Sequence, residues 1–244
     1  MRKEFVMGKY AFESRVRYSE IAEDEKLSLS GIIDYFQDCS TFQSEDLGIG
    51  LSWLTEHHLV WLMARWQVVI KRRPHFGEKI RISTWPYKFQ LAFGSRNFFI
   101  ESEDGELLAY ADSLWVYMDS EKGEPARVGE YEGNLYAPLP PFDMNYAPRK
   151  IRPPKVTPVT AETFAVTHSH LDSNHHVNNG QYLKMAENYL PEDFTVGEFR
   201  IEYKKSAVLG DHITPMIYDA GDEFFVVLTD GAGTTFAITH FIRQ

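Results

Sequence analysis

Hydrophobic residues recur with helical spacing in two segments of the chain. The first predicts a helix over residues 29–47, because the i, i+3, i+4, i+7 spacing of a buried face is met by Leu29, Ile32, Ile33 and Phe36. The second predicted helix begins at Asn178 or Asn179 and ends before Pro191. Asn178 would cap it, with Gln181 in the capping-box position. Its apolar stripe consists of Tyr182, Leu183, Ala186, Tyr189 and Leu190.

Strand-like runs follow each predicted helix and are separated by turn signals such as the segments 103–106 and 219–222. After the first helix they lie at residues 60–71, 79–85, 96–101 and 107–118, and after the second at 198–204, 212–218, 223–228 and 234–242. One helix followed by several antiparallel strands, repeated, predicts α+β units in which a curled sheet wraps a central helix. This is the hotdog arrangement.

Two segments of the chain match each other without a gap for fifteen residues, 66–80 and 199–213. A basic pair aligns in both (Lys71-Arg72 with Lys204-Lys205), and Phe-Gly-Glu aligns with Leu-Gly-Asp. The match indicates a tandem duplication. We expect an N-terminal copy over residues 1–120, a connector over 121–160 that carries eight of the twelve prolines, and a C-terminal copy over 161–244.

Composition narrows the classes of protein that the chain can represent. It has 25 Lys and Arg against 35 Asp and Glu, and a net charge of −10 argues against nucleic acid as the main partner. A single cysteine excludes a disulfide framework and a Cys-based zinc site. The N-terminal ten residues show no targeting segment, and no stretch is long enough for a membrane span. We therefore expect a soluble, cytoplasmic protein.

The segment 171–179 has the highest density of candidate chemistry and directly precedes the second predicted helix. Its polar residues alternate, so that in an extended segment Asp172, Asn174, His176 and Asn178 would point to one side. A carboxylate, a carboxamide and an imidazole would then converge. A solvated turn would also explain the Asp and Asn residues, although it would not require a His at that position.

This signature, with Tyr182 after it, resembles that of the acyl-acyl-carrier-protein thioesterases, a family with plant plastid members and a bacterial branch. The resemblance extends to residues 47–50, 59–61, 84–85 and 201–205. It implies a double hotdog fold and hydrolysis of the thioester between a fatty acyl chain and the phosphopantetheine of acyl carrier protein. It implies no metal and no organic cofactor, and a homodimer is expected from it. The lack of a transit segment favours a bacterial cytoplasmic member over a plastid one.

The resemblance places the catalytic residues at Asp172, Asn174 and His176. It also shows one departure. Plant members carry a Glu and a Cys, both proposed as catalytic, where this chain has Ser206 and Ala207. A cysteine nucleophile at that position is therefore excluded.

Thioester hydrolysis requires activation of a water molecule and stabilisation of the carbonyl oxygen, whereas the thiolate leaves readily. His176 is the candidate general base, because its ordinary pKa suits neutral pH. Asp172 would orient the imidazole, help to activate the water, or serve as a structural acceptor, and Asn174 would donate to the carbonyl oxygen or accept from the water. Free backbone N–H groups at the helix start, over Asn178, Asn179 and Gly180, would form an oxyanion site. Asn178 and Asn179 could equally be a cap and a turn residue.

Other residues are weaker candidates. Ser206 could contribute a hydroxyl or be a bystander, Glu187 could supply a carboxylate from the helix, and Cys39 is interpreted as a packing residue. The first copy has Ala22, Asp24 and Lys26 where the second has the signature, so we expect one active site per chain, with the first copy lining an acyl pocket.

Several alternatives remain open from sequence. The chain could be an acyl-CoA thioesterase with the same chemistry on another carrier. The clustered Asp172, Asn174 and His176 argue against a hotdog dehydratase, and the lack of a helix-turn-helix or basic face argues against a non-catalytic acyl-thioester-binding protein. For a carrier protein, the candidate docking residues are Arg149, Lys150, Arg152 and Lys155, followed by Lys71, Arg72, Arg73, Lys204 and Lys205; incidental charge on a solvated linker would explain the first four equally well.

Overall fold

The structure is a computed structural model that describes residues 9–244. The prediction of no targeting segment concerns residues that lie largely outside this range. The chain forms two compact units. One contains residues 9–64 and Ile70–Tyr146, and the other contains Arg65–Val69 and Ala147–Gln244. The boundaries expected at residues 120 and 160 stay a prediction.

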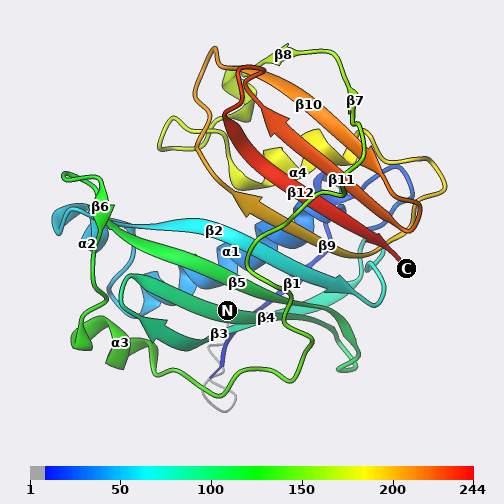
Figure 1. The fold of residues 1–244 in the computed structure, drawn as a ribbon. Coiled ribbons are helices and arrows are strands. Elements are labelled where there is room, and N and C mark those ends of the chain that lie inside the picture. Colours follow the sequence, from blue (N-terminus) through cyan, green and yellow to red (C-terminus); the bar gives the residue numbers. More distant parts are fainter. Residues whose placement is uncertain (1–8) are drawn as a thin grey trace. The chain divides into compact units, whose positions relative to one another are not determined.

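In the first unit, an antiparallel sheet curls around helix α1 (Figure 1). The strand order is β1-β3-β4-β5, and α1 packs against β1 and β3. The bounds of the elements are α1 Leu29–Asp46, α2 Leu51–Glu56, α3 Glu130–Tyr136, β1 Tyr10–Arg15, β2 Leu59–Ile70, β3 Lys79–Gln90, β4 Phe93–Ser102, β5 Leu107–Asp119 and β6 Glu124–Pro125, with a 3-10 turn at Tyr18–Glu20.

The second unit repeats this plan around helix α4, with the antiparallel order β9-β12-β11-β10-β7 (Figure 1). The Arg65–Val69 part of β2 pairs with β9 and belongs to this unit, and α4 packs against β11 and β12. The bounds are α4 Asn179–Glu187, β7 Val159–Thr160, β8 Phe164–Ala165, β9 Val196–Tyr203, β10 His212–Asp219, β11 Glu223–Thr229 and β12 Thr235–Arg243, with a 3-10 turn at His168–His170. The predicted α+β double hotdog is confirmed.

Each central helix forms because one face is apolar and buried. In α1 the predicted face is confirmed, since Ile32, Ile33 and Phe36 have no exposed surface. Burying side chains of this size contributes about 1.5–3 kcal/mol each. In α4, Leu183 and Ala186 are fully buried, but the helix ends at Glu187 and leaves Tyr189 and Leu190 beyond it. The predicted apolar stripe was therefore too long at its C-terminal end.

The duplication extends to backbone detail in the loop before each helix. Residues 18–29 and 168–179 have the same succession of a 3-10 turn, a tight turn and a helix start. Glu25 and His175 occupy equivalent positions and adopt left-handed φ values of 60° and 61°. Few non-glycine residues do so, so their agreement indicates a common backbone plan.

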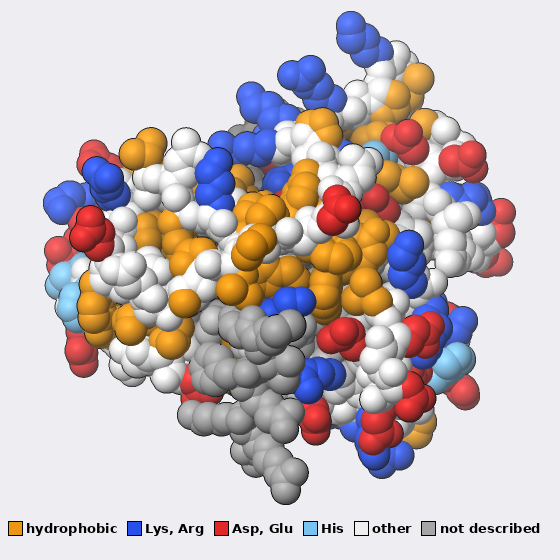
Figure 2. All heavy atoms as spheres, turned by 90° about the horizontal axis from the view of Figure 1, so that it is seen from below, with side chains coloured by type: hydrophobic (Ala, Val, Ile, Leu, Met, Phe, Trp, Pro, Cys, Tyr) orange, Lys and Arg blue, Asp and Glu red, His pale blue; other side chains and the backbone are white. Residues whose placement is uncertain are grey.

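None of the helices within residues 9–244 is long and apolar enough to cross a membrane. On the face drawn in Figure 2, hydrophobic side chains occupy the centre, and Lys and Arg side chains gather along the upper edge.

Candidate active site

The signature segment forms a tight turn. Leu171 and Val177 pair across it, and the N–H of Asp172 donates to the carbonyl oxygen of His176 at 2.8 Å. The N–H of His175 donates to the carbonyl oxygen of Asp172 at 3.1 Å, and the left-handed His175 reverses the chain. The prediction of an extended segment with alternating side chains was therefore wrong. What brings the three polar residues together is the turn.

Asp172 organises this turn through its carboxylate. Its Oδ1 accepts the N–H of Asn174 at 2.8 Å and the N–H of His176 at 3.2 Å. This is the way in which Asp stabilises a turn through the backbone two residues on. Asn174 is exposed and His176 is half-buried. The arrangement supports a positioning role for Asp172, and leaves an amide and an imidazole able to meet a substrate.

The loop after β9 lies against the signature turn. The N–H of Val177 donates to the carbonyl oxygen of Ala207 at 2.9 Å, and His176 pairs with Val208. Ser206 is exposed immediately before this contact. Both candidate positions that differ from the plant pattern are therefore next to the signature.

Tyr182 holds this loop in place, a role that the sequence did not reveal. Its hydroxyl accepts the N–H of the buried Ala207 at 2.8 Å. Burial raises the pKa of Tyr182 to about 12, so the hydroxyl stays protonated at neutral pH. Tyr182 thus links α4 to the loop that supports His176.

The start of α4 differs from the predicted oxyanion site. Asn178 caps the helix, but its side chain accepts the N–H of Gly180 at 2.8 Å, where the capping box would have used that of Gln181. The N–H of Asn178 itself donates to the carbonyl oxygen of His170 at 2.9 Å. The prediction that the N–H groups of Asn178 and Gly180 are free was therefore wrong. A role in catalysis for the start of α4, Asn179 included, stays a prediction.

Two weaker candidates, Glu187 and Cys39, are not part of the signature turn. Glu187 is the last residue of α4, about 12 Å along the helix axis from Asn179 at 1.5 Å per residue. Cys39 lies in the other unit, where it is fully buried and its Sγ–H donates to the carbonyl oxygen of Ile82 at 3.7 Å. Burial raises the pKa of the Cys39 thiol, which disfavours the reactive thiolate. These features support the interpretation of Cys39 as a packing residue.

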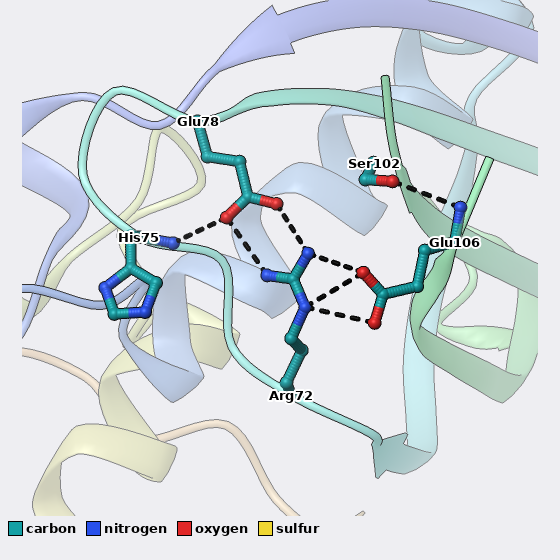
Figure 3. Close-up of polar contacts among 5 residues, drawn as sticks. All are labelled: Arg72, His75, Glu78, Ser102 and Glu106. Atoms are coloured by element: carbon teal, nitrogen blue, oxygen red, sulfur yellow. Dashed lines mark hydrogen bonds and ion pairs between the residues drawn. The ribbon is translucent and has the colours of Figure 1, made fainter. Parts of the chain in front are cut away.

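The equivalent turn of the first copy is closed by an ion pair, and a second set of ion pairs lies beside it. Asp24, which corresponds to Asn174, pairs with Arg73, and Arg73 also donates to the carbonyl oxygen of Leu27 at 3.4 Å. Its neighbour Arg72 bridges the carboxylates of Glu78 and Glu106, with closest contacts of 2.8 and 2.7 Å (Figure 3).

These ion pairs change the interpretation of the basic residues in the first copy. Hydrogen bonds from Arg72 hold the pKa of Glu78 below its usual range. Arg72 and Arg73 are thus engaged within the chain, which argues against the prediction that they serve as docking residues. The four connector residues Arg149, Lys150, Arg152 and Lys155 are all exposed.

Within residues 9–244, no group of three or more His, Cys, Asp or Glu side chains is arranged to hold a metal ion.

Comparison with known proteins identifies the family. Residues 8–134 match the model of the acyl-ACP thioesterase N-terminal domain, and residues 155–243 match that of the C-terminal domain. A palmitoyl-acyl carrier protein thioesterase of Gossypium hirsutum is 26% identical over 211 residues, which cover 78% of this chain and 50% of that protein. The chain thus spans about half the length of the curated relatives it matches.

Solved structures agree in fold. An acyl-ACP thioesterase from Bacteroides thetaiotaomicron superposes with a TM-score of 0.88 at 21% identity, covering 97% of this chain and 98% of that one. A 12:0-ACP thioesterase from Umbellularia californica gives a TM-score of 0.84 at 16% identity, covering 99% of both chains. With both domain models matched in order along its sequence, this chain belongs to the acyl-ACP thioesterase family.

Proposed function

We propose that the chain hydrolyses the thioester of fatty acyl-acyl carrier protein and releases a free fatty acid and the holo-carrier. The observation that carries this proposal is the match to both domains of the family together with an intact Asp172, Asn174 and His176 signature. The partner is then acyl carrier protein with a fatty acyl group on its phosphopantetheine.

The signature turn supports a mechanism in which water is the nucleophile. His176 accepts a proton from the water as the water oxygen attacks the carbonyl carbon. The amide of Asn174, exposed on the same turn, donates to the carbonyl oxygen as it gains charge. The C–S bond then breaks, and the proton on His176 passes to the departing thiolate. Asp172 keeps both residues in register through the backbone N–H groups that it accepts.

Covalent catalysis has less support from the side chains present. Cys39 is buried with a raised thiol pKa, and Ala207 replaces the cysteine of the plant pattern. Ser206 is exposed beside the turn, so its hydroxyl is a candidate nucleophile. Mass spectrometry during turnover distinguishes the mechanisms, since an acyl group trapped on Ser206 would replace the water mechanism with a covalent one.

The direct test of the function is the release of thiol from matched acyl-carrier and acyl-CoA substrates. We expect a higher kcat/KM with the carrier substrate, and loss of both activities in His176→Ala. A preference for acyl-CoA would instead make the chain an acyl-CoA thioesterase. Binding of acyl thioester without thiol release would identify a non-catalytic binding protein.

Other properties implied by the family stay predictions with simple tests. Activity that survives dialysis against a chelator would support a reaction without a metal. Sedimentation analysis would test the homodimer, and fractionation of the source cells would test the bacterial cytoplasmic setting.

A further inference from the structure

The connector is fixed to the second unit by hydrogen bonds at Ala147 and Pro148, where the chain enters this unit. The N–H of Ala147 donates to Gln67 Oε1 at 2.8 Å, and the carbonyl oxygen of Ala147 accepts from Arg65 Nη1 at 3.1 Å. The carbonyl oxygen of Pro148 accepts from Arg200. These three side chains come from paired positions of β2 and β9, so they anchor the connector to one face of this sheet.

A second anchor lies three residues further on. Ile151 is buried, and its N–H donates to Glu202 Oε2 at 2.9 Å. Glu202 is itself buried and also pairs with Lys204. A buried carboxylate that accepts both a backbone N–H and an ammonium is costly to disturb. The chain between Ala147 and Ile151 is therefore held at both ends.

This anchoring holds the backbone on both sides of Arg149 and Lys150, Arg152 follows the second anchor directly, and Lys155 lies between that anchor and the pairing of β7 with β10. We call Arg149, Lys150, Arg152 and Lys155 the basic strap; all four are exposed. Residues 147–158 contain these four basic residues and no acidic one, in a chain of net charge −10. Charges on a segment that is already ordered lose less conformational entropy when they bind a partner.

The basic strap also lies near the signature within the same unit. Its anchor Glu202 precedes Ser206 by four residues, which span at most about 13 Å because β9 ends at Tyr203 and an extended strand rises 3.3 Å per residue. Ala207 then contacts the signature turn through Val177. Lys204 is paired with Glu202, so the exposed Lys205 is the residue that adds positive charge along this path.

We propose that the basic strap is the docking surface for the carrier protein, which it recognises as a negatively charged protein surface that presents a phosphopantetheine arm. The inference rests on the proposed function. The net charge of the chain is −10, so most of its surface would repel an acidic partner. The four basic side chains, which lie within seven residues of one another in the sequence, would attract it.

The test compares two double variants with the same change in charge. Lys150→Glu/Arg152→Glu alters the strap. Lys88→Glu/Arg127→Glu alters a Lys and an Arg of the first unit that are also exposed, and serves as the control. For acyl-carrier substrate, we expect the strap variant to raise KM by about tenfold with little change in kcat, because charges at the rim of an interface act mainly on association. The control variant should behave as wild type.

A small acyl thioester without a carrier should be hydrolysed equally by all three proteins. Equal KM values for strap variant and control, or a strap effect that extends to the small thioester, would overturn the proposal. If wild type hydrolyses no acyl thioester, the proposed function fails on its own. Binding of holo-carrier by calorimetry then still tests the strap: weaker binding by the strap variant alone supports it, and equal or absent binding refutes it.

Discussion

The turns before α1 and α4 share one backbone plan and differ in where their polar side chains are satisfied. In the first copy, Asp24 pairs with Arg73. In the second, the equivalent residues are Asn174 and Ser206, and both are exposed. The first copy thus binds its own polar groups, whereas the second presents them to solvent. The two copies therefore share one backbone geometry and differ in the contacts of their polar side chains.

A second difference concerns the loop that supports each turn. The carbonyl oxygens of Pro74 and Ala207 accept equivalent N–H groups, from Leu27 at 2.8 Å and from Val177 at 2.9 Å. Pro74 has no N–H of its own, and the helix residue at the position equivalent to Tyr182 is the apolar Ile32. Ala207 has an N–H, and the Tyr182 hydroxyl accepts it. In each copy the helix residue therefore suits the loop: a hydroxyl accepts the N–H where the loop has one, and an apolar side chain is present where the loop has none.

The largest expected effect separates the two turns by activity. His176→Ala should lower kcat by at least about 100-fold, the usual scale for a general base. Lys26→Ala, at the equivalent position of the first copy, should leave kcat unchanged. Steady-state hydrolysis of acyl-carrier substrate measures both, with circular dichroism to confirm folding. A folded His176→Ala protein with near-normal kcat would remove His176 from the mechanism.

The second prediction introduces into the second copy the arginine that pairs with the turn of the first copy. Ser206→Arg should place a guanidinium against Asn174, as Arg73 lies against Asp24, and lower kcat by roughly tenfold through misplacement of the amide. Ser206→Ala creates no such contact and should have a modest effect. The two variants are compared by kcat. If Ser206→Ala were as damaging as Ser206→Arg, the hydroxyl itself would be required.

Periodicity predicted the helices and the main strands because their burial is local and repetitive. The bounds of α1 and β5 agree with the sequence prediction to within one residue at each end. β1 and the seven-residue α3 were missed, since β1 is a short run with little buried surface and α3 lies among prolines without sustained periodicity.

The geometry of the site was harder to predict. The sequence does not predict the left-handed conformation of His175, because glycine is the residue that usually adopts positive φ values. The contact between Tyr182 and Ala207 joins residues 25 apart, beyond any local pattern. Comparison of the two copies would have revealed this contact. The first copy has Pro74 and Ile32 at the positions of Ala207 and Tyr182, so the N–H and the hydroxyl are both absent from it.

The third prediction tests this exchange by stability. Tyr182→Phe leaves the buried N–H of Ala207 without its acceptor and should destabilise the protein by about 1–3 kcal/mol. Ala207→Pro, which copies Pro74, removes that N–H, so the double variant should recover part of the loss. Urea unfolding of the single and double variants measures the coupling. Additive losses would show that Tyr182 and Ala207 act independently.

The smallest expected effect is a difference between the copies in how their stability depends on pH. Asp112 on β5 and His240 on β12 occupy equivalent positions in the two copies. Each lies four residues after the residue, Leu108 or Phe236, whose carbonyl oxygen accepts the backbone N–H groups of the aligned basic pair. Asp112 is buried and accepts the hydroxyl of Tyr87 at 2.8 Å. His240 is also buried, stacks on a ring of β11, and contacts Glu223 Oε2 at 2.8 Å.

Burial lowers the pKa of His240 below its ordinary value of 6.5, although the carboxylate of Glu223 opposes this shift. As the pH falls through about 6.5, the unfolded chain therefore binds a proton at His240 before the folded chain does, and stability declines by at most about 1.4 kcal/mol per pH unit from this group. His240→Gln removes the titration, so its free energy of unfolding should fall less between pH 7.5 and pH 5.5 than that of wild type. Urea unfolding at both pH values measures the difference. An equal decline in both proteins would mean that His240 binds its proton as readily in the folded state as in the unfolded one, and that this position does not make the second copy more sensitive to acid.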